Sequence, residues 1–407
     1  MTDGKVFDIG TLDAQITAPV RPAKLPEGAV GRYLKRHHLR RSKANVLRAR
    51  AFLRKRRDAA AAKIGKEISG SESAEPHQVI YGTMRVGGVY TFIHTINNNQ
   101  NLLLVVTIAG HEITAVNKVF FDGEEVVFGS GFPGSATSPS KYAGKVYAQV
   151  NLGSTGQSAL SQLVTDAPTY WTSNHKQSNR AHVYLKLTWD GNAFPNGLPD
   201  IVFEVQGKKV YDPRSGLTQF SANPALCIAD YLTDSSYGLG YSTSDIDTTA
   251  LTAAADICDQ SVSLITGGTE SRYTLNGSFN TDETPGNILG QMLTAMAGDL
   301  VLPVAGKAYI YAGAYRSPSI TLTEDDIISD IQVQTRISKR DSFNAVKGTY
   351  TSPQNSWEET DFPAVRNSFY LAEDNGEVVF EDISLPFTTS AATAQRIAKI
   401  TLEQIRQ

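Results

Sequence analysis

The pentapeptide HEITA at residues 111–115 is the stretch of this sequence that most nearly matches a catalytic signature. A zinc protease needs a second His four residues after the first, on the same helix face, and Ala115 stands at that position. The residues around it also have strand rather than helix character. The sequence therefore predicts no zinc centre at this place.

Other catalytic patterns are equally incomplete. AGKVY at 143–147 and AGKAY at 305–309 lack the upstream Gly spacing and the following Ser or Thr of a phosphate-binding loop. No G-x-S-x-G nucleophile elbow occurs, and the seven His are scattered along the chain. Asp325 and Asp326 are adjacent acids, which in an exposed turn are usually solvated. We therefore expect a protein that is not an enzyme and uses no metal and no cofactor.

The two cysteines, Cys227 and Cys258, are too few for a disulfide scaffold and are expected to be buried thiols. The opening residues MTDGKVFDIG are polar and acidic, unlike a cleavable signal peptide. The most apolar long stretch, 288–306, carries Gln291, Asp299 and Pro303, so no membrane insertion is expected. These features predict folding and assembly in a reducing cytoplasm.

Basic residues are concentrated in one short stretch. Residues 32–57 hold 12 of the 38 Lys and Arg and no acid, which leaves 26 basic against 41 acidic residues elsewhere, a net charge of −15. Their Ala, Leu, Arg and Lys content favours a helix, so we expect a basic helical arm on an acidic body. The candidates in this arm for contacts with a partner or with DNA are Arg36, Arg40, Arg41, Arg48, Arg54 and Arg57.

Residues 77–220 are rich in Val, Ile, Tyr and Thr and predict mostly strands. The polar run NNNQN at 97–101 separates two such stretches, as in a hairpin. Gly, Ser and Pro over 129–140 predict a loop. Strand character returns in three later segments: Val146–Val150, His182–Trp189 and Ile201–Tyr211.

Helical spacing replaces the strand pattern after residue 222. Asn223 is a suitable N-cap for a first helix, Asp247–Cys258 predicts a second, and Thr284 with Pro285 starts a third. Residues 313–388 return to β character. The chain closes on a helix whose apolar stripe is expected to comprise Ala394, Ile397, Ala398, Thr401 and Ile405.

Several strings in one order carry a family resemblance. They are LTWDGNAFPNGLPDIVFEVQGKKVYDPRSG at 187–216, NPALCIADYLTDSSYGLG at 223–240, CDQSV at 258–262, GGTESRYTLNGSF at 267–279, GNILGQMLTAMAGDLVLPVAGKAYIYAG at 286–313 and RDSFNAVKGTYTSPQNSWE at 340–358. Together they resemble the tip attachment protein J family, the central tail-tip hub proteins of lambda-like long-tailed phages. The resemblance covers about 77–407 and does not reach the basic arm.

The family's fold implies a mainly β protein with an α+β insertion, a multi-domain tail-hub fold of small β-barrels like those of baseplate hubs and type VI spike hubs. By this resemblance, 1–76 would be an extended, basic helical arm and linker. Residues 77–221 would form a hub barrel with an inserted β domain at about 110–185. Residues 222–312 would form the α+β domain, and 313–407 would form a second barrel, expected to be incomplete, ending in a helix.

The implied function is structural: a homotrimer that closes the tail tube at the virion tail tip and opens for DNA ejection. The implied partners are distal tail and tail-tip proteins, the C-terminal end of the tape measure protein, the central fibre and DNA in transit through the lumen. The acidic remainder of the chain would avoid gripping DNA phosphates. Two other classes stay open, a receptor-binding adhesin and a tail-associated envelope hydrolase, although no pair of carboxylates stands out for glycan cleavage.

The basic arm leaves three roles open: docking on acidic surfaces of neighbouring subunits, which we favour, contact with DNA or the tape measure protein, and a merely solvated helix. A membrane-surface role would need a clearer apolar face.

Within the family strings, structural roles are expected, with partner contact as the alternative. In KKVYDPR, Asp212 would accept hydrogen bonds in a turn and Arg214 would fork onto a carboxylate. These motif residues are Tyr211, Asp212, Pro213, Arg214, the core thiol Cys258 with the turn acid Asp259, and Gly267 and Gly268 in a chain reversal.

Overall fold

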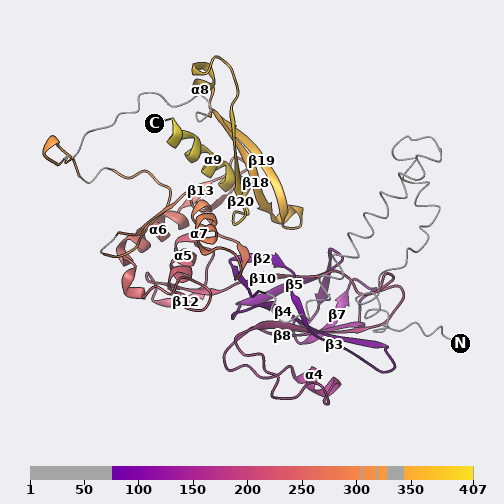
Figure 1. Cartoon of the computed structure of the whole chain (residues 1–407). Helices are drawn as coiled ribbons and strands as arrows, with labels where there is room; N and C mark the ends of the chain where they lie inside the picture. The colour runs from indigo at the N-terminus through magenta and orange to yellow at the C-terminus, as the bar shows by residue number, and fades with distance from the viewer. Residues whose placement is uncertain (1–75, 304–305, 318–319, 327, 329–342, 407) are drawn as a thin grey trace, which may run out of the picture. The chain divides into compact units, whose positions relative to one another are not determined.

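The computed structural model describes residues 76–303, 306–317, 320–326, 328 and 343–406. The six Arg of the basic arm lie outside these residues, so the helix and contacts predicted for them stay predictions. The described chain divides into two compact units (Figure 1). Unit 1 comprises residues 87–108 and 124–201, and unit 2 comprises 76–86, 109–123 and the described residues from 202 onward.

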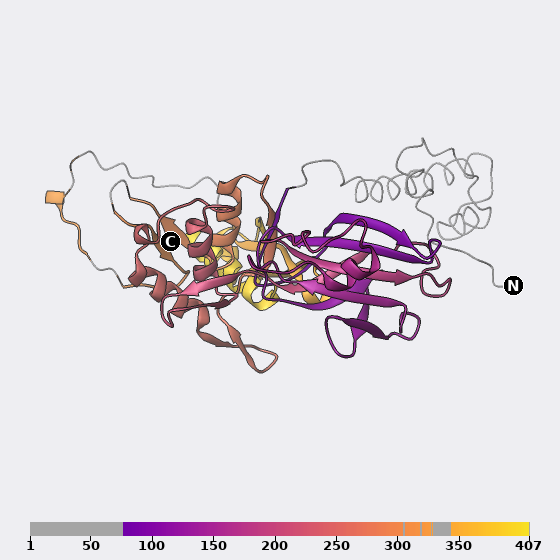
Figure 2. The ribbon, with the colours of Figure 1, turned by 90° about the horizontal axis from the view of Figure 1, so that it is seen from below.

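Nine strands are hydrogen-bonded in one sheet, which confirms a mainly β fold. In chain order they are β2 (Thr83–Val86), β3 (Val89–Ile96), β4 (Asn101–Ala109), β5 (Ala115–Phe121), β6 (Glu124–Phe128), β7 (Gly134–Ser138), β8 (Val146–Asn151), β9 (Ala181–Thr188) and β10 (Ile201–Gln206). Their order across the sheet is β2-β10-β5-β6-β7-β8-β9-β4-β3. Strands β2, β5 and β10 of this sheet lie in unit 2 and the others in unit 1, all within the indigo to magenta part of the chain (Figure 2).

The NNNQN run forms the expected hairpin turn between β3 and β4, where Ile96 pairs with Asn101. Asn97, Asn98 and Asn99 all have positive φ, which Asn tolerates better than most residues. The predicted loop at 129–140 is partly wrong, because β7 lies within it and Ser135 pairs with Tyr147 of β8. Small Ser, Ala and Thr residues can pair as a strand although their local signal is that of a turn.

An apolar core of unit 1 is covered by the long connection between β8 and β9, residues 152–180. The short helix α4 (Ser161–Asp166) packs there, and the buried residues are Leu103, Val105, Leu160, Leu163, Ala167, Trp171 and Tyr184. Gln157 organises this connection: its Nε2 lies 2.7–3.2 Å from the carbonyl oxygens of Lys176, Gln177 and Arg180. One buried amide thereby satisfies backbone groups that would otherwise lack partners.

Unit 2 contains small antiparallel strand pairs around three helices. The pairs are β1 (Gln78–Tyr81) with β15 (Gly277–Asn280), β11 (Lys209–Asp212) with β12 (Leu217–Phe220), β13 (Ser261–Ser263) with β14 (Thr269–Ser271), and β16 (Asp299–Val301) with β17 (Tyr309–Tyr311). The helices are α5 (Pro224–Thr233), α6 (Thr248–Asp259) and α7 (Pro285–Thr294), with the 3-10 turn η2 (Thr243–Asp245) between α5 and α6. Each of these helices begins within a residue or two of the predicted start.

One apolar core joins these helices. Cys227 on α5 and Cys258 on α6 are both buried in it as free thiols, as predicted, and Cys258 Sγ lies 3.9 Å from Met296 Sδ. Burial raises the pKa of Cys258 to about 12 and raises that of Cys227 well above its ordinary value. Both thiols therefore stay protonated and unreactive at neutral pH.

Asn223 caps α5 and also ties it to α6. Its Oδ1 accepts the backbone N–H of Ala225 at 3.1 Å and Leu226 at 3.4 Å, and its Nδ2 donates to the carbonyl of Ala255 at 2.9 Å. The side chain is buried, so water cannot replace these partners.

Replacing Asn223 with Ala is expected to lower the free energy of unfolding by about 2 kcal/mol, because a cap and a buried donor are lost together. Urea unfolding followed by circular dichroism measures it. The matched control is Asn287→Ala on the exposed first turn of α7, expected within about 0.5 kcal/mol of the parent. Equal losses of stability in Asn223→Ala and Asn287→Ala would contradict the capping role of Asn223.

The C-terminal part of unit 2 is a three-stranded sheet covered by a helix (Figure 1). Its elements are β18 (Ala345–Ser352), η4 (Pro353–Asn355), β19 (Glu358–Arg366), α8 (Ser368–Glu373), β20 (Phe380–Leu385) and α9 (Ala391–Ile405). Ala394, Ile397 and Ala398 are buried, as their spacing predicts, but Thr401 and Ile405 are only half-buried and Leu402 is buried instead. The start of α9 is held by Glu270, which accepts from Ser390 Oγ at 2.7 Å and pairs with Arg396 Nη2 at 3.1 Å.

Candidate functional site

The β11–β12 hairpin carries the KKVYDPR string, and its turn has the hydrogen bonds expected of that string. The Asp212 carbonyl accepts the N–H of Gly216 at 2.8 Å, and Asp212 Oδ1 accepts the N–H of Arg214 at 2.9 Å. Gly216 has a φ of 72°, which closes the turn. Pro213 stands at its first corner position, where its fixed φ suits a turn.

Arg214 binds three carboxylates. Its Nε and Nη2 lie 3.0 and 2.8 Å from the two oxygens of Asp212, its Nη1 lies 3.0 Å from Asp256, and its Nη2 lies 2.8 Å from Asp259. The Arg214 guanidinium lowers the pKa of Asp212 despite partial burial. Arg214 therefore ties the hairpin to the last turn of α6. The sequence pattern predicted a fork onto a carboxylate without naming it, and the contacts with Asp256 and Asp259 were not foreseen.

Arg214→Lys is expected to lower the free energy of unfolding by about 1–2 kcal/mol, because an ammonium cannot make the planar, bidentate contact with Asp212. The change is measured by thermal unfolding. Arg180→Lys, at an exposed position of unit 1, serves as the control and should change stability by less than about 0.5 kcal/mol. If Arg214→Lys left the free energy of unfolding unchanged, the contact with Asp212 would contribute little to stability.

A second ionic cluster holds the other end of the hairpin. Lys208 Nζ lies 2.7 Å from Asp230 Oδ2 and also pairs with Asp234, both on or next to α5. Tyr81 donates its hydroxyl to the same Asp230 oxygen at 2.6 Å. All three charged side chains are less than 20% exposed. Burial alone would raise the pKa of Asp234, but Lys208 and the N–H groups of Tyr237 and Ser236 hold it below its ordinary value.

Between the two clusters the hairpin presents apolar side chains to solvent. Tyr211 is 56% exposed on one face of the hairpin, and Leu217, which pairs with Asp212, is 57% exposed on the other face. Because β11 is held at both ends, Tyr211 loses little conformational freedom when a partner covers it. Exposed Tyr side chains are common at the centres of protein interfaces. The hairpin is thus a candidate partner surface.

Gly267 and Gly268 form the turn of the β13–β14 hairpin, with φ of 89° and 82°. This is the chain reversal that the Gly pair predicts, and it exposes Ile265 fully at its tip. The roles assigned to all of these motif residues remain predictions, since their geometry fits both a structural and a partner-binding role.

His111 of HEITA is a buried structural residue. Its Nδ1 lies 2.8 Å from the Glu112 carbonyl, and its Nε2 accepts the N–H of Ile80 at 3.0 Å. Burial lowers its pKa to about 4, so the ring is neutral at pH 7. Residues 111–114 connect into β5, which begins at Ala115, rather than forming the strand expected there.

Within the described ranges, no group of three or more His, Cys, Asp or Glu side chains is arranged to hold a metal ion. In the same part of the chain, no helix combines the length and the apolar character needed to cross a membrane.

Comparisons with known proteins bear on this geometry. No protein-family model matches the chain. Over 261 residues, 59% of this chain, the sequence is 25% identical to baseplate hub protein pb3 of Escherichia phage T5. The match spans 27% of that protein, so this chain corresponds to about a quarter of its relative's length.

The fold is similar to that of a chain in the virion of the native gene transfer agent particle. The TM-score is 0.50 at 16% identity, over 82% of this chain and 73% of the other. A 43 kDa tail protein of prophage MuSo2 from Shewanella oneidensis gives a TM-score of 0.23 at 12% identity, over 81% and 76% of the two chains, which carries no argument. In sequence the chain is similar to a phage baseplate hub protein, and in fold to a virion component, which supports a structural protein of the phage tail or baseplate.

Proposed function

We propose that this chain is the central hub of a phage tail tip, a structural virion protein that closes the tail tube, joins it to the tip and central fibre, and opens for DNA ejection. The observation that carries the proposal is the 25% identity with a baseplate hub protein over 261 residues. The resemblance of the motif strings to the tip attachment protein J family supports the finer assignment to the tail tip.

The proposed assembly is a homotrimer built in the host cytoplasm. Its partners would be distal tail proteins, the C-terminal end of the tape measure protein, the central fibre and the DNA in transit. The basic arm at 32–57 would dock on acidic surfaces of neighbouring subunits. The proposed domain division is 1–76, 77–221, 222–312 and 313–407. The rigidly held β11–β12 hairpin supports the proposal because it offers a preorganised contact surface.

A nonsense mutation in the gene tests the hub against an adhesin. Without a hub, complete tails should not form, because the hub would organise the tip on which the tube is built. An adhesin would instead leave particles of normal appearance that fail to adsorb to the host. Substitutions in the surface loops of 129–180 that abolish adsorption but leave particle assembly intact would also favour the adhesin.

A zymogram of the purified chain on host envelope tests the hydrolase alternative, and a clear band would contradict a purely structural role.

A further inference from the structure

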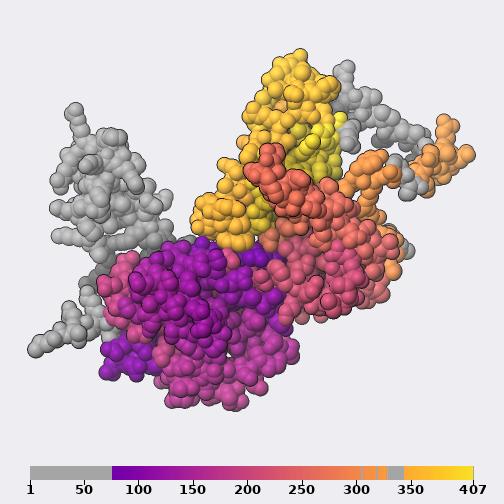
Figure 3. Space-filling model, turned by 180° about the vertical axis from the view of Figure 1, so that it is seen from behind, coloured from indigo at the N-terminus to yellow at the C-terminus, as the bar shows by residue number. Residues whose placement is uncertain are grey.

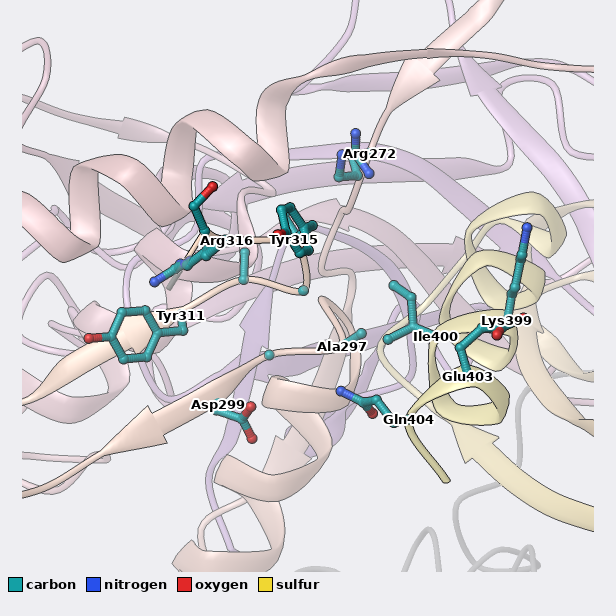
Figure 4. A pocket seen from close by; sticks show the side chains of 15 residues that line it. Arg272, Ala297, Asp299, Tyr311, Tyr315, Arg316, Lys399, Ile400, Glu403 and Gln404 are labelled. Atoms are coloured by element: carbon teal, nitrogen blue, oxygen red, sulfur yellow. The ribbon is translucent and has the colours of Figure 1, made fainter. Parts of the chain in front are cut away.

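A groove of about 880 Å³ lies in unit 2 between α9 and the segment 311–317. Figure 4 shows Lys399, Glu403 and Gln404 of α9 on one side and Tyr311, Tyr315 and Arg316 on the other. Ala297 and Ile400 add apolar surface between them, and Arg272 and Asp299 complete the labelled lining. The groove therefore combines aromatic and aliphatic surface with charged groups at its edges.

The groove lining holds three cations, Lys399, Arg316 and Arg272, and two acids, Asp299 and Glu403. Among the residues that the structure describes, Lys399, Arg316 and Arg272 have no carboxylate within ion-pair distance. The Arg316 guanidinium lies 4.2 Å from the centre of the Tyr311 ring, and Arg272 Nε bonds the neutral Gln260 side chain at 3.0 Å. Glu403, by contrast, already accepts the Tyr370 hydroxyl at 2.6 Å.

A nearby segment of the chain has the complementary character. Residues 320–326 read ITLTEDD, and Ile320 and Leu322 are 74% and 71% exposed. In an extended chain these two side chains lie on one face. The 3-10 turn η3 (Glu324–Asp326) follows with three exposed acids, and Asp326 Oδ2 fixes it by accepting the Thr323 N–H at 2.8 Å. Figure 3 shows this orange segment at the periphery of the surface.

We propose that residues 320–326 of one protomer dock in the groove of a neighbouring protomer of the same chain. Ile320 and Leu322 would cover Ile400, Ala297 and Tyr311, while the acids of η3 would face Lys399, Arg316 and Arg272. This inference rests on the proposed function, because it supplies a contact between copies of the hub.

The high exposure of the two aliphatic side chains favours a second copy as the occupant. In the single chain the segment leaves both of them in solvent, so it does not fill its own groove. A contact between two different patches of identical chains is head-to-tail, and such contacts form a closed ring when the rotation closes. The docking therefore suits a ring of protomers.

Paired cysteines test the docking in the full chain. Leu322→Cys and Gln404→Cys place one thiol on the segment and one on the exposed rim of the groove, and the native thiols are buried. After mild oxidation, chains with both changes should form covalent dimers and trimers on a non-reducing gel. Mixing the two single variants should give dimers only. A monomer that has lost both thiols would show closure within one chain, and a monomer with free thiols would show no docking; either result overturns the proposal.

Charge exchange provides a second readout. Lys399→Glu and Glu324→Lys should each weaken self-association at least tenfold, and the double variant should restore it, as measured by sedimentation. Lys307→Glu, at another exposed site, is the control and should leave association unchanged. Failure of the double variant to recover would contradict the pairing. If microscopy finds the chain at the tail axis although the cysteines do not cross-link, the proposed function stands and only the docking fails.

Discussion

Replacing Lys208 with Met is expected to lower the free energy of unfolding by about 3–5 kcal/mol, the largest effect of any single change described above. Lys208 neutralises Asp230 and Asp234, which are less than 20% exposed, and its loss leaves two carboxylates without their counter-charge in a poorly hydrated site. Tyr81 continues to donate to Asp230 but brings no positive charge. Thermal unfolding should show a decrease in Tm on the order of 10 °C.

The neighbouring residue provides a matched control. Lys209 pairs with Glu112 at 2.8 Å, but both side chains are at least 40% exposed, so Lys209→Met should change stability by less than about 1 kcal/mol. A double-mutant cycle with Asp230→Asn separates the ion pair from general packing, because the two changes should not add. Equal effects of Lys208→Met and Lys209→Met would contradict the role of burial.

Acidification is expected to remove about 3 kcal/mol of stability through His111 alone. The pKa of His111 falls from 6.5 to about 4 on folding, mainly because the ring is buried. The folded protein thus binds fewer protons than the unfolded chain between these values. The contribution of His111 is complete above pH 6.5 and is lost as the pH falls toward 4.

His111→Gln isolates this contribution from that of the carboxylates. Three side chains surround His111. Lys208 and Asp234 affect its charge, and the centre of the Tyr237 ring lies 6.5 Å from the centre of the imidazole ring. All three remain in the variant. At pH 7 the variant should be less stable than the parent. Between pH 6.5 and 4, measured by urea unfolding, the parent should lose about 3 kcal/mol more than the variant. Parallel pH profiles would show that His111 is not held neutral by the fold.

Local sequence signals predicted local structure well in this chain. Asn223 followed by Pro224 marks the start of α5, because an Asx side chain and a Pro satisfy or remove the free N–H groups of a first turn. The apolar spacing of Ala394, Ile397 and Ala398 likewise identifies the buried face of α9. The turn at Asp212 follows from the chemistry of Asp-Pro, which acts within a few residues.

Contacts between distant residues were not predictable in the same way. Lys208 meets Asp230 and Asp234, and Arg214 meets Asp256 and Asp259, only because β11 packs against α5 and α6. Nothing in the spacing of these residues indicates that packing. The groove between α9 and residues 311–317 depends on tertiary structure for the same reason. Strand β7 was missed because Ser, Thr and Gly usually signal a loop.

The most direct test of the hub assignment is an electron cryomicroscopy reconstruction of the tail tip in intact particles, with this chain located in the density. The proposal predicts three copies in a closed ring around the tail axis, at the end of the tube. Density at the periphery of the tip, or none at all, would contradict the hub and favour an adhesin or a tail-associated hydrolase.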